Sequence, residues 1–151
     1  MKLIIRVVYT LGVFIDLSKA FDTINHSILL DKLNCYGVRG IVNDWFKSYL
    51  SKRHQYVRIS DSSSRLLPIT CGVPQGLILG PLLFILYIND IVNASTLANI
   101  IMFADDTNLF FHDKNIENLY KITNYELEKI SIWFKLNKLS LNIKKKFHNF
   151  S

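Results

Sequence analysis

The chain has 151 residues, of which 50% are hydrophobic and 13% aromatic, and it carries a formal net charge of +6. A chain of this length can bury about 70% of its unfolded surface. One domain over residues 1–151 therefore needs neither a disulfide nor a structural metal, and the apolar content excludes a disordered protein. The basic charge favours a polyanionic partner such as nucleic acid, although an ordinary basic protein fits the charge equally well.

The spacing of cysteines and histidines argues against a zinc site and a disulfide framework. Cys35 and Cys71 are far apart, and the four histidines lack the short pairings that zinc sites use. This pattern fits a reducing compartment, so we expect an intracellular protein. Arg6 interrupts the apolar N-terminal run, and the apolar stretch 77–88 is shorter than the ~20 residues of a membrane span. We therefore expect neither a secretory signal nor a membrane partner.

The first predicted element is a strand over residues 7–15, which are rich in β-branched and aromatic side chains. Gly12 is the one weak point of this pattern. Because the stretch has no polar alternation, we expect a central strand covered on both faces. Asp16 would then lie at the end of the strand, beside the strand next to it.

Two helices are expected after this strand. The first follows the possible N-caps Thr23 and Asn25, carries apolar residues at helical spacing and closes at Gly37. The second spans roughly residues 41–50 and has an aromatic face. We expect both helices to cover the sheet.

A change of period then predicts a short hairpin, with strands at 54–59 and 65–70 around the turn-rich residues 61–64. Pro68 makes the second strand an edge strand. The hairpin is basic, so it fits either a phosphate-binding surface or a solvated polar face. Its basic residues are Lys52, Arg53, Arg58 and Arg65.

A glycine-rich loop over residues 71–76 is typical of a chain segment that lets another backbone approach closely. Pro81 then begins a helix that is expected to run to about Asn93 and to be largely buried. Residues 115–137 have the spacing of a long amphipathic helix. The stretch 139–147 is expected to form a short strand that turns into a basic run.

The most informative stretch is 100–111, in which two apolar runs flank the adjacent carboxylates Asp105 and Asp106. It predicts a β-hairpin with the acids at its tip, because Asp tolerates the positive φ of tight turns. Two neighbouring negative charges invite a hard divalent cation with oxygen ligands, and Mg²⁺ fits best. An ordinary acidic turn is the alternative. If the 7–15 strand lies beside this hairpin, Asp16 becomes a third converging carboxylate.

Three motifs in this order resemble the reverse transcriptases of non-LTR, LINE-like retrotransposons. They are Phe14-Ile15-Asp16-Leu17-Ser18-Lys19-Ala20-Phe21-Asp22, the stretch Gly72-Val73-Pro74-Gln75-Gly76 with residues 77–84 after it, and Phe103-Ala104-Asp105-Asp106. Tyr87-Ile88-Asn89-Asp90 and the stretch 137–142 extend the match to nearly the whole chain. The resemblance implies an α+β polymerase palm, with an antiparallel sheet covered by helices and with the fingers and thumb largely missing.

The resemblance also implies the chemistry of the site. Asp16 and Asp105 would be the principal ligands of two Mg²⁺ ions, with Mn²⁺ as a possible substitute, and Asp106 would contribute. The 3′-hydroxyl of a DNA primer, which is base-paired with an RNA template, would attack the α-phosphate of a dNTP and release pyrophosphate. The element's ribonucleoprotein would occupy the cytoplasm and nucleus. The alternative function is a catalytically inactive nucleic-acid-binding remnant of a decayed element.

Four further residues acquire roles from the resemblance. Phe21 matches the aromatic steric gate that excludes the ribonucleotide 2′-hydroxyl, with ordinary core packing as the alternative. Gln75 matches the residue that contacts the incoming nucleotide and the template strand. Gly72 and Gly76 would let nucleic acid approach the backbone. Lys145 aligns best with the lysine assigned as proton donor to pyrophosphate.

The sequence departs from the family pattern in two places. Leu77 stands where the family usually has Ser, which puts template handling in question. Residues 144–146 are all lysine, where the family usually shows Lys-Thr.

Overall fold

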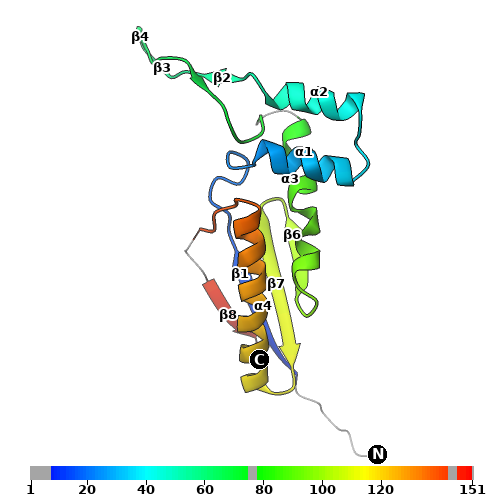
Figure 1. Ribbon diagram of the computed structural model, residues 1–151. Helices are drawn as coiled ribbons and strands as arrows, with labels where there is room; N and C mark the ends of the chain where they lie inside the picture. The colour runs from blue at the N-terminus through cyan, green and yellow to red at the C-terminus, as the bar shows by residue number, and fades with distance from the viewer. Residues whose placement is uncertain (1–7, 75–77, 143–145, 151) are drawn as a thin grey trace, which may run out of the picture. The chain divides into compact units, whose positions relative to one another are not determined.

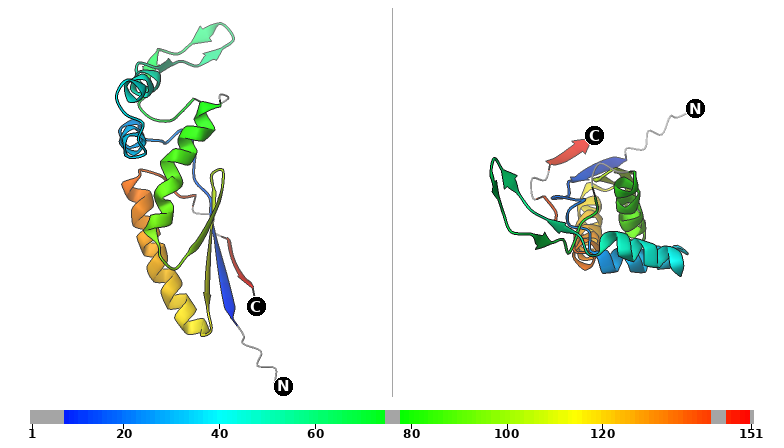
Figure 2. Two further views of the ribbon diagram at one scale, coloured as in Figure 1. Left: turned by 90° about the vertical axis from the view of Figure 1, so that its right-hand side faces the viewer. Right: turned by 90° about the horizontal axis from the view of Figure 1, so that it is seen from above.

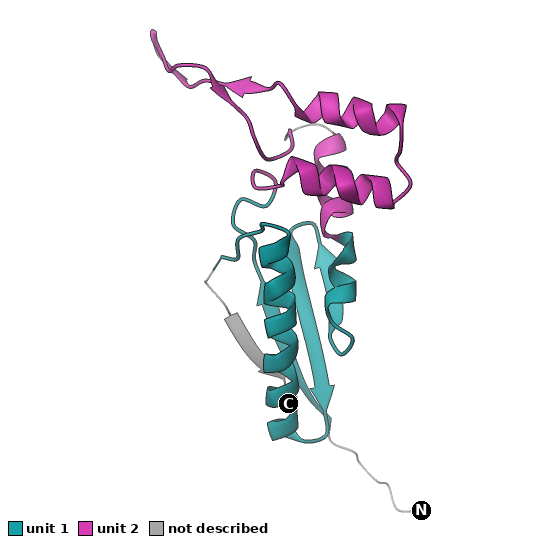
Figure 3. Ribbon diagram, in the orientation of Figure 1, with its two compact units in different colours: residues 1–20, 89–151 teal, residues 21–88 magenta. Residues whose placement is uncertain are grey.

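The computed structural model describes residues 8–74, 78–142 and 146–150. The chain forms two compact units, of which unit 1 contains residues 1–20 and 89–151 and unit 2 contains residues 21–88 (Figure 3). Each unit has its own packing, and each is described by itself below.

A four-stranded antiparallel sheet forms the centre of unit 1, with the strand order β6-β7-β1-β8 (Figure 1). The strands are β1 (Tyr9–Ile15), β6 (Asn99–Phe103), β7 (Asp106–Asp113) and β8 (Lys146–Phe150). β1 lies between β7 and β8, which confirms the prediction of a central strand. The β6–β7 hairpin also forms where the sequence predicts it.

One long helix, α4 (Ile116–Leu136), runs along one face of this sheet and contacts β1 and β7 (Figure 2). It begins at the N-cap Asn115, whose side-chain oxygen accepts hydrogen bonds from two backbone N–H groups of the first turn. Between helix and sheet lies an apolar core, because alternate strand residues and one helix stripe are buried. Its members include Leu11, Val13, Leu109, Phe111, Leu119, Ile130 and Phe134.

The C-terminal strand differs from the sequence-based expectation. Residues 139–142 contribute one isolated bridge, between Leu17 and Leu141, and the paired strand β8 begins at Lys146. The prediction placed the strand before the basic run, whereas the structure pairs the last lysine of that run, Lys146, and the residues after it with β1. The pairing partner lies more than 130 positions earlier in the sequence, so no local pattern identifies it.

Unit 2 contains the helices α1 (His26–Cys35), α2 (Ile41–Leu50) and α3 (Leu79–Ile88), and α1 packs against both of the others. Asn25 is the N-cap of α1, as predicted. α4 covers the sheet of unit 1, whereas α1 and α2 belong to unit 2, so the expectation that these two helices cover the sheet stays a prediction. A hydrophobic helix face indicates burial, and it does not name the partner.

The predicted basic hairpin consists of two short ladders. β2 (His54–Gln55) pairs with β5 (Leu67–Pro68), and β3 (Arg58–Ile59) pairs with β4 (Ser62–Ser63). The two serines, which the sequence assigns to the turn, therefore form a strand that pairs with β3.

The helix predicted from Pro81 to Asn93 ends at Ile88 and continues as the 3₁₀ helix η1 (Asn89–Ala94), which belongs to unit 1. α3 was predicted to be largely buried, but it is buried along one side only, since Leu82 and Ile85 are exposed. Among the described residues, no helix is both long and apolar enough to cross a membrane.

Candidate metal and nucleotide site

The strand register brings two of the predicted acids to the same end of the sheet. The last pair between β1 and β7 joins Ile15 to Thr107. Asp16 is the next residue after Ile15, and Asp106 is the residue before Thr107. Because the two strands are antiparallel, Asp16 and Asp106 leave the ladder together and both are exposed.

The third acid, Asp105, lies in the turn between β6 and β7 and is half-buried. The ladder closes with the pair between Phe103 and Asp106, which leaves a two-residue turn. Its positive φ belongs to Ala104, at 54°. The prediction that an aspartate adopts the positive φ of this turn is therefore wrong.

A neighbouring segment holds Asp16 in place. The side-chain amide of Asn142 donates to Oδ2 of Asp16 at 2.9 Å, and the backbone N–H of Asn142 donates to the Asp16 carbonyl at 2.8 Å. Ser18 N donates to Ser140 O at 2.9 Å, so residues 140–142 run alongside the segment that follows β1. Asn142 was not predicted as a site residue, although it lies in the matching stretch 137–142.

The acids fit an open cation site. Within the described ranges, no group of three or more His, Cys, Asp or Glu side chains lies close enough together to hold a metal ion. Mg²⁺ is commonly bound by only one or two carboxylates, with waters and substrate phosphates as its other ligands. The oxygen donors of Asp16 and Asp106, exposed at one sheet end, have the chemistry of such a site.

The predicted nucleotide-contacting residues belong to unit 2. Phe21 is half-buried, and its ring packs against the ring of Phe84 at a centroid distance of 4.8 Å. Gly72 has a φ of +83°, and a Cβ at that position would lie 2.8 Å from the backbone oxygen of Asp22. Gly72 therefore allows close backbone approach, and the partner seen here is the chain itself.

The remaining sequence predictions lie outside the described residues. They concern Gln75, Gly76, Leu77 and Lys145. Their roles stay predictions.

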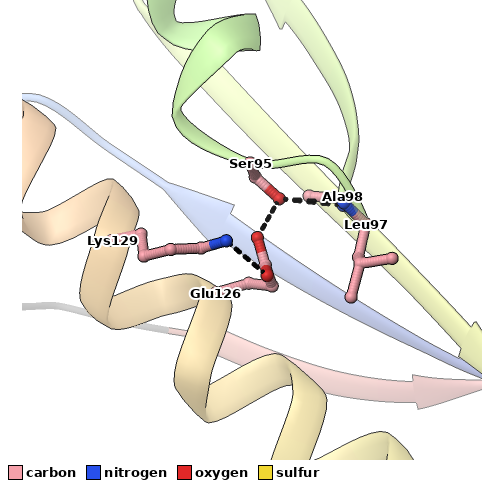
Figure 4. Close-up of polar contacts among 5 residues, drawn as sticks. All are labelled: Ser95, Leu97, Ala98, Glu126 and Lys129. Atoms are coloured by element: carbon pink, nitrogen blue, oxygen red, sulfur yellow. Dashed lines mark hydrogen bonds and ion pairs between the residues drawn. The ribbon is translucent and has the colours of Figure 1, made fainter.

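A buried polar cluster in unit 1, which the sequence analysis missed, supports the start of β6 (Figure 4). Glu126 of α4 is 1% exposed and accepts hydrogen bonds from the Ser95 hydroxyl and from Lys129 Nζ. Ser95 Oγ in turn accepts from the backbone N–H groups of Leu97 and Ala98. The cluster thus ties the loop before β6 to α4.

The charge state of this cluster follows from its contacts. Burial raises the pKa of the Glu126 carboxyl, but the hydrogen bonds from Lys129 and Ser95 and the Lys129 charge outweigh it and leave the pKa below its ordinary value. Glu126 is therefore ionised at neutral pH, and its charge is compensated inside unit 1.

Comparison with known proteins identifies the family of this chain. Residues 6–149 match the family model described as reverse transcriptase (RNA-dependent DNA polymerase). Two similar proteins of Drosophila melanogaster are the "probable RNA-directed DNA polymerase from transposon BS", 31% identical over 91% of this chain, and the "RNA-directed DNA polymerase from mobile element jockey", 31% identical over 72%. This chain spans only 16% and 12% of their respective lengths.

Solved structures show the same fold. Telomerase from Candida albicans, in complex with a fragment of telomeric RNA, superimposes with a TM-score of 0.70 over 94% of this chain and 27% of its own, at 14% identity. A telomerase from Candida tropicalis gives a TM-score of 0.67 over 95% of this chain and 26% of its own, at 13% identity.

These likenesses confirm the predicted α+β palm, and the resemblance to non-LTR retrotransposon enzymes is confirmed by the relatives from mobile elements. The chain belongs to the reverse transcriptase family.

Proposed function

We propose that this chain is the palm segment of an RNA-directed DNA polymerase of the non-LTR retrotransposon type. The observation that carries the proposal is the register of β1 and β7, which delivers Asp16 and Asp106 to one sheet end with Asn142 bonded to Asp16. The relatives named as RNA-directed DNA polymerases support the same reaction. Since the chain covers a small part of their length, polymerisation would also draw on segments beyond these residues.

The reaction would transfer a nucleotide from a dNTP to a DNA primer along an RNA template. The new O–P bond forms between the primer 3′-oxygen and the α-phosphorus as the bond to pyrophosphate breaks, and the proton of the 3′-hydroxyl passes to solvent. Asp16, Asp105 and Asp106 would hold divalent cations, Mg²⁺ in the first instance, which neutralise the charge developing on the attacking and leaving oxygens. Asn142 would fix the rotation of the Asp16 carboxylate.

Unit 2 would supply substrate selection. Phe21 would place its ring where a ribose 2′-hydroxyl has to lie, and Phe84 would keep that ring in position. Gln75 would contact the incoming nucleotide and the template, and Gly76 would let the strand approach. Lys145 would give a proton to the leaving pyrophosphate.

Primer extension on an RNA template tests the proposal. The isolated chain is expected to bind nucleic acid with an affinity that falls as salt rises, yet to extend primers undetectably. Holding primer, template and triphosphate in attack geometry is worth roughly 7–11 kcal/mol and needs more of the polymerase. A chimera in which this chain replaces the matching segment of the transposon BS polymerase is expected to extend primers.

The matched variants decide which residues carry the activity. In the chimera, Asp105→Asn should lower extension more than about a hundredfold, because it removes the negative charge of a proposed metal ligand. Glu128→Gln, which neutralises an exposed carboxylate on α4, should leave extension unchanged. Equal activity of the Asp105→Asn variant and the parent chimera would contradict the proposal. A chimera that binds nucleic acid but never extends primers would favour the inactive remnant.

A further inference from the structure

Two segments of unit 2 are joined backbone to backbone. We name residues 21–25 the gate turn, because it begins with Phe21, and residues 71–74 the glycine loop. An isolated bridge pairs Asn25 with Cys71. Two backbone hydrogen bonds continue the pairing, from Gly72 N to Ile24 O at 2.8 Å and from Val73 N to Phe21 O at 2.9 Å.

Gly72 is the point of closest approach between these segments. The three nearest atoms to a Cβ at this position would be backbone atoms of Asp22, at 2.8 to 3.0 Å. Gly72 is buried, so its backbone carbonyl needs a hydrogen-bond partner. That partner is a side chain.

His26, the first residue of α1, provides the partner. Its ring Nε2 lies 2.7 Å from the carbonyl oxygen of Gly72, and the histidine is only half-buried. Asn25 already caps the helix through its side chain, which accepts from Ile28 N, so His26 is not needed as a cap. A carbonyl oxygen can only accept a hydrogen bond, so this contact requires the proton on Nε2.

We propose that His26 is a positioning residue for nucleotide selection. Its Nε2–H holds the glycine loop against the gate turn. The Val73 N–H, one residue further along that loop, holds the Phe21 carbonyl. The Phe21 ring packs on Phe84 of α3. A hydrogen-bonded path thus runs from His26 through Gly72 and Val73 to the backbone of Phe21, without passing through the metal-binding acids.

This inference rests on the proposed function, since Phe21 selects substrates only if the chain handles nucleotides. The contact itself is independent of that function. The contact can therefore be tested on the 151-residue chain, and the role in selection on the chimera.

The tautomer is measured on the unaltered chain by ¹⁵N NMR of the imidazole rings. His26 is expected in the Nε2–H form, with slow exchange of that proton compared with the exposed ring of His54. A His26 ring that carries its proton on Nδ1 alone would overturn the assignment. Because no substitution is needed, a folding defect cannot confuse this result.

Amide hydrogen exchange of Gly72 and Val73 tests the positioning role. His26→Phe keeps a ring but loses the donor, and it should speed exchange of both amides about fivefold. His26→Gln places an amide nitrogen near the position of Nε2 and should restore the slow rates. His54→Phe is the matched control and should change neither amide. Equal rates in the Phe and Gln variants would reduce His26 to a packing residue.

Binding of a Mg²⁺–dNTP complex separates the two proposals. In the chimera with the transposon BS polymerase, His26→Phe should weaken dNTP binding about fivefold, and His26→Gln should restore it. Unchanged affinity would overturn the role in selection. A chimera that binds no dNTP, while the 151-residue chain shows the expected exchange pattern, would overturn the proposed function and leave the His26 contact standing.

Discussion

The two compact units hold their candidate site residues by different means. In unit 1, Asp16 and Asp106 are placed by a ladder of seven register pairs, and a side chain, Asn142, bonds to one carboxylate. In unit 2, Phe21 and Gly72 are placed by backbones in contact, with no room for a Cβ at the closest point. A ladder distributes its support over many residues, whereas a close backbone contact depends on one glycine.

The chain offers a direct way to follow each unit. It has two tryptophans, Trp45 in α2 of unit 2 and Trp133 in α4 of unit 1. In a Trp133→Phe background fluorescence reports unit 2, and in a Trp45→Phe background it reports unit 1. Unfolding by denaturant can then be compared between the units.

The largest expected effect is that of Gly72→Ala on unit 2. The substitution carries a left-handed backbone cost of about 1–2 kcal/mol, and the overlap with Asp22 adds about 1–3 kcal/mol. Gly37→Ala is the matched control, since Gly37 has a φ of +93° but open space around its Cβ position. It should show only the backbone cost. Trp45 fluorescence measures the loss of unfolding free energy in each variant. Equal losses would show that the close contact with Asp22 does not limit the residue at position 72.

Next in size is the effect of Glu126→Ala on unit 1. The variant leaves the Ser95 hydroxyl and the Lys129 ammonium without their buried acceptor, which should cost about 2 kcal/mol of unfolding free energy. Trp133 fluorescence measures the loss. Glu128→Ala, at an exposed position of the same helix, should cost less than about 0.5 kcal/mol.

The same carboxyl gives unit 1 a pH dependence. Because folding lowers the pKa of Glu126, its contribution is present above the unfolded-state pKa and is lost as the pH falls through the folded-state pKa. Unit 1 should therefore lose stability as the pH falls below the ordinary pKa of a glutamate carboxyl, and Glu126→Gln should flatten that loss. An unchanged acid profile in the Gln variant would show that other carboxyls cause it.

A change in selection without a change in metal affinity is expected for Phe21→Val in the chimera. Opening the space beside the 2′-carbon should relax discrimination between dNTP and rNTP by roughly 10- to 200-fold. The ratio of kcat/KM values for the two nucleotides measures it. Unchanged discrimination would mean that the Phe21 ring serves only to pack against Phe84.

The smallest expected effect is that of Asn142→Ala in unit 1. Asp16 is exposed, so stability should fall by less than about 1 kcal/mol. Mn²⁺ affinity should fall about tenfold, because the carboxylate loses the donor that orients it. A Mn²⁺ titration of both proteins measures this, and Asn142→Asp, which adds a like charge beside Asp16, separates orientation from charge.

Much of the fold follows from local patterns in the sequence. The limits of α2 and the capping of α1 by Asn25 match the prediction, because periodicity and side-chain caps act within a few residues. The common end of β1 and the 100–111 hairpin was also foreseen. It required only that two apolar strands with terminal acids lie side by side.

The missed features depend on distant partners. β8 pairs with β1 across most of the chain, and its residues show no clear alternation. Glu126 was overlooked because glutamates on long helices are usually solvated. Its position could have revealed it, since the buried stripe of α4 contains Glu126 among its members, which are Leu119, Thr123, Glu126, Ile130 and Phe134. An acid inside an apolar stripe indicates a buried polar partner.

We propose that acids almost 90 positions apart in the sequence form one cation site in unit 1. Paramagnetic broadening by Mn²⁺ of the amide signals of the ¹⁵N-labelled chain tests it most directly. The signals of Asp16, Asp105 and Asp106 are expected to broaden together at low Mn²⁺. Asp105→Asn should suppress all three effects, whereas Glu128→Gln should suppress none. Broadening that begins at other carboxylates, or that affects Asp16 and Asp105 independently, would contradict the claim.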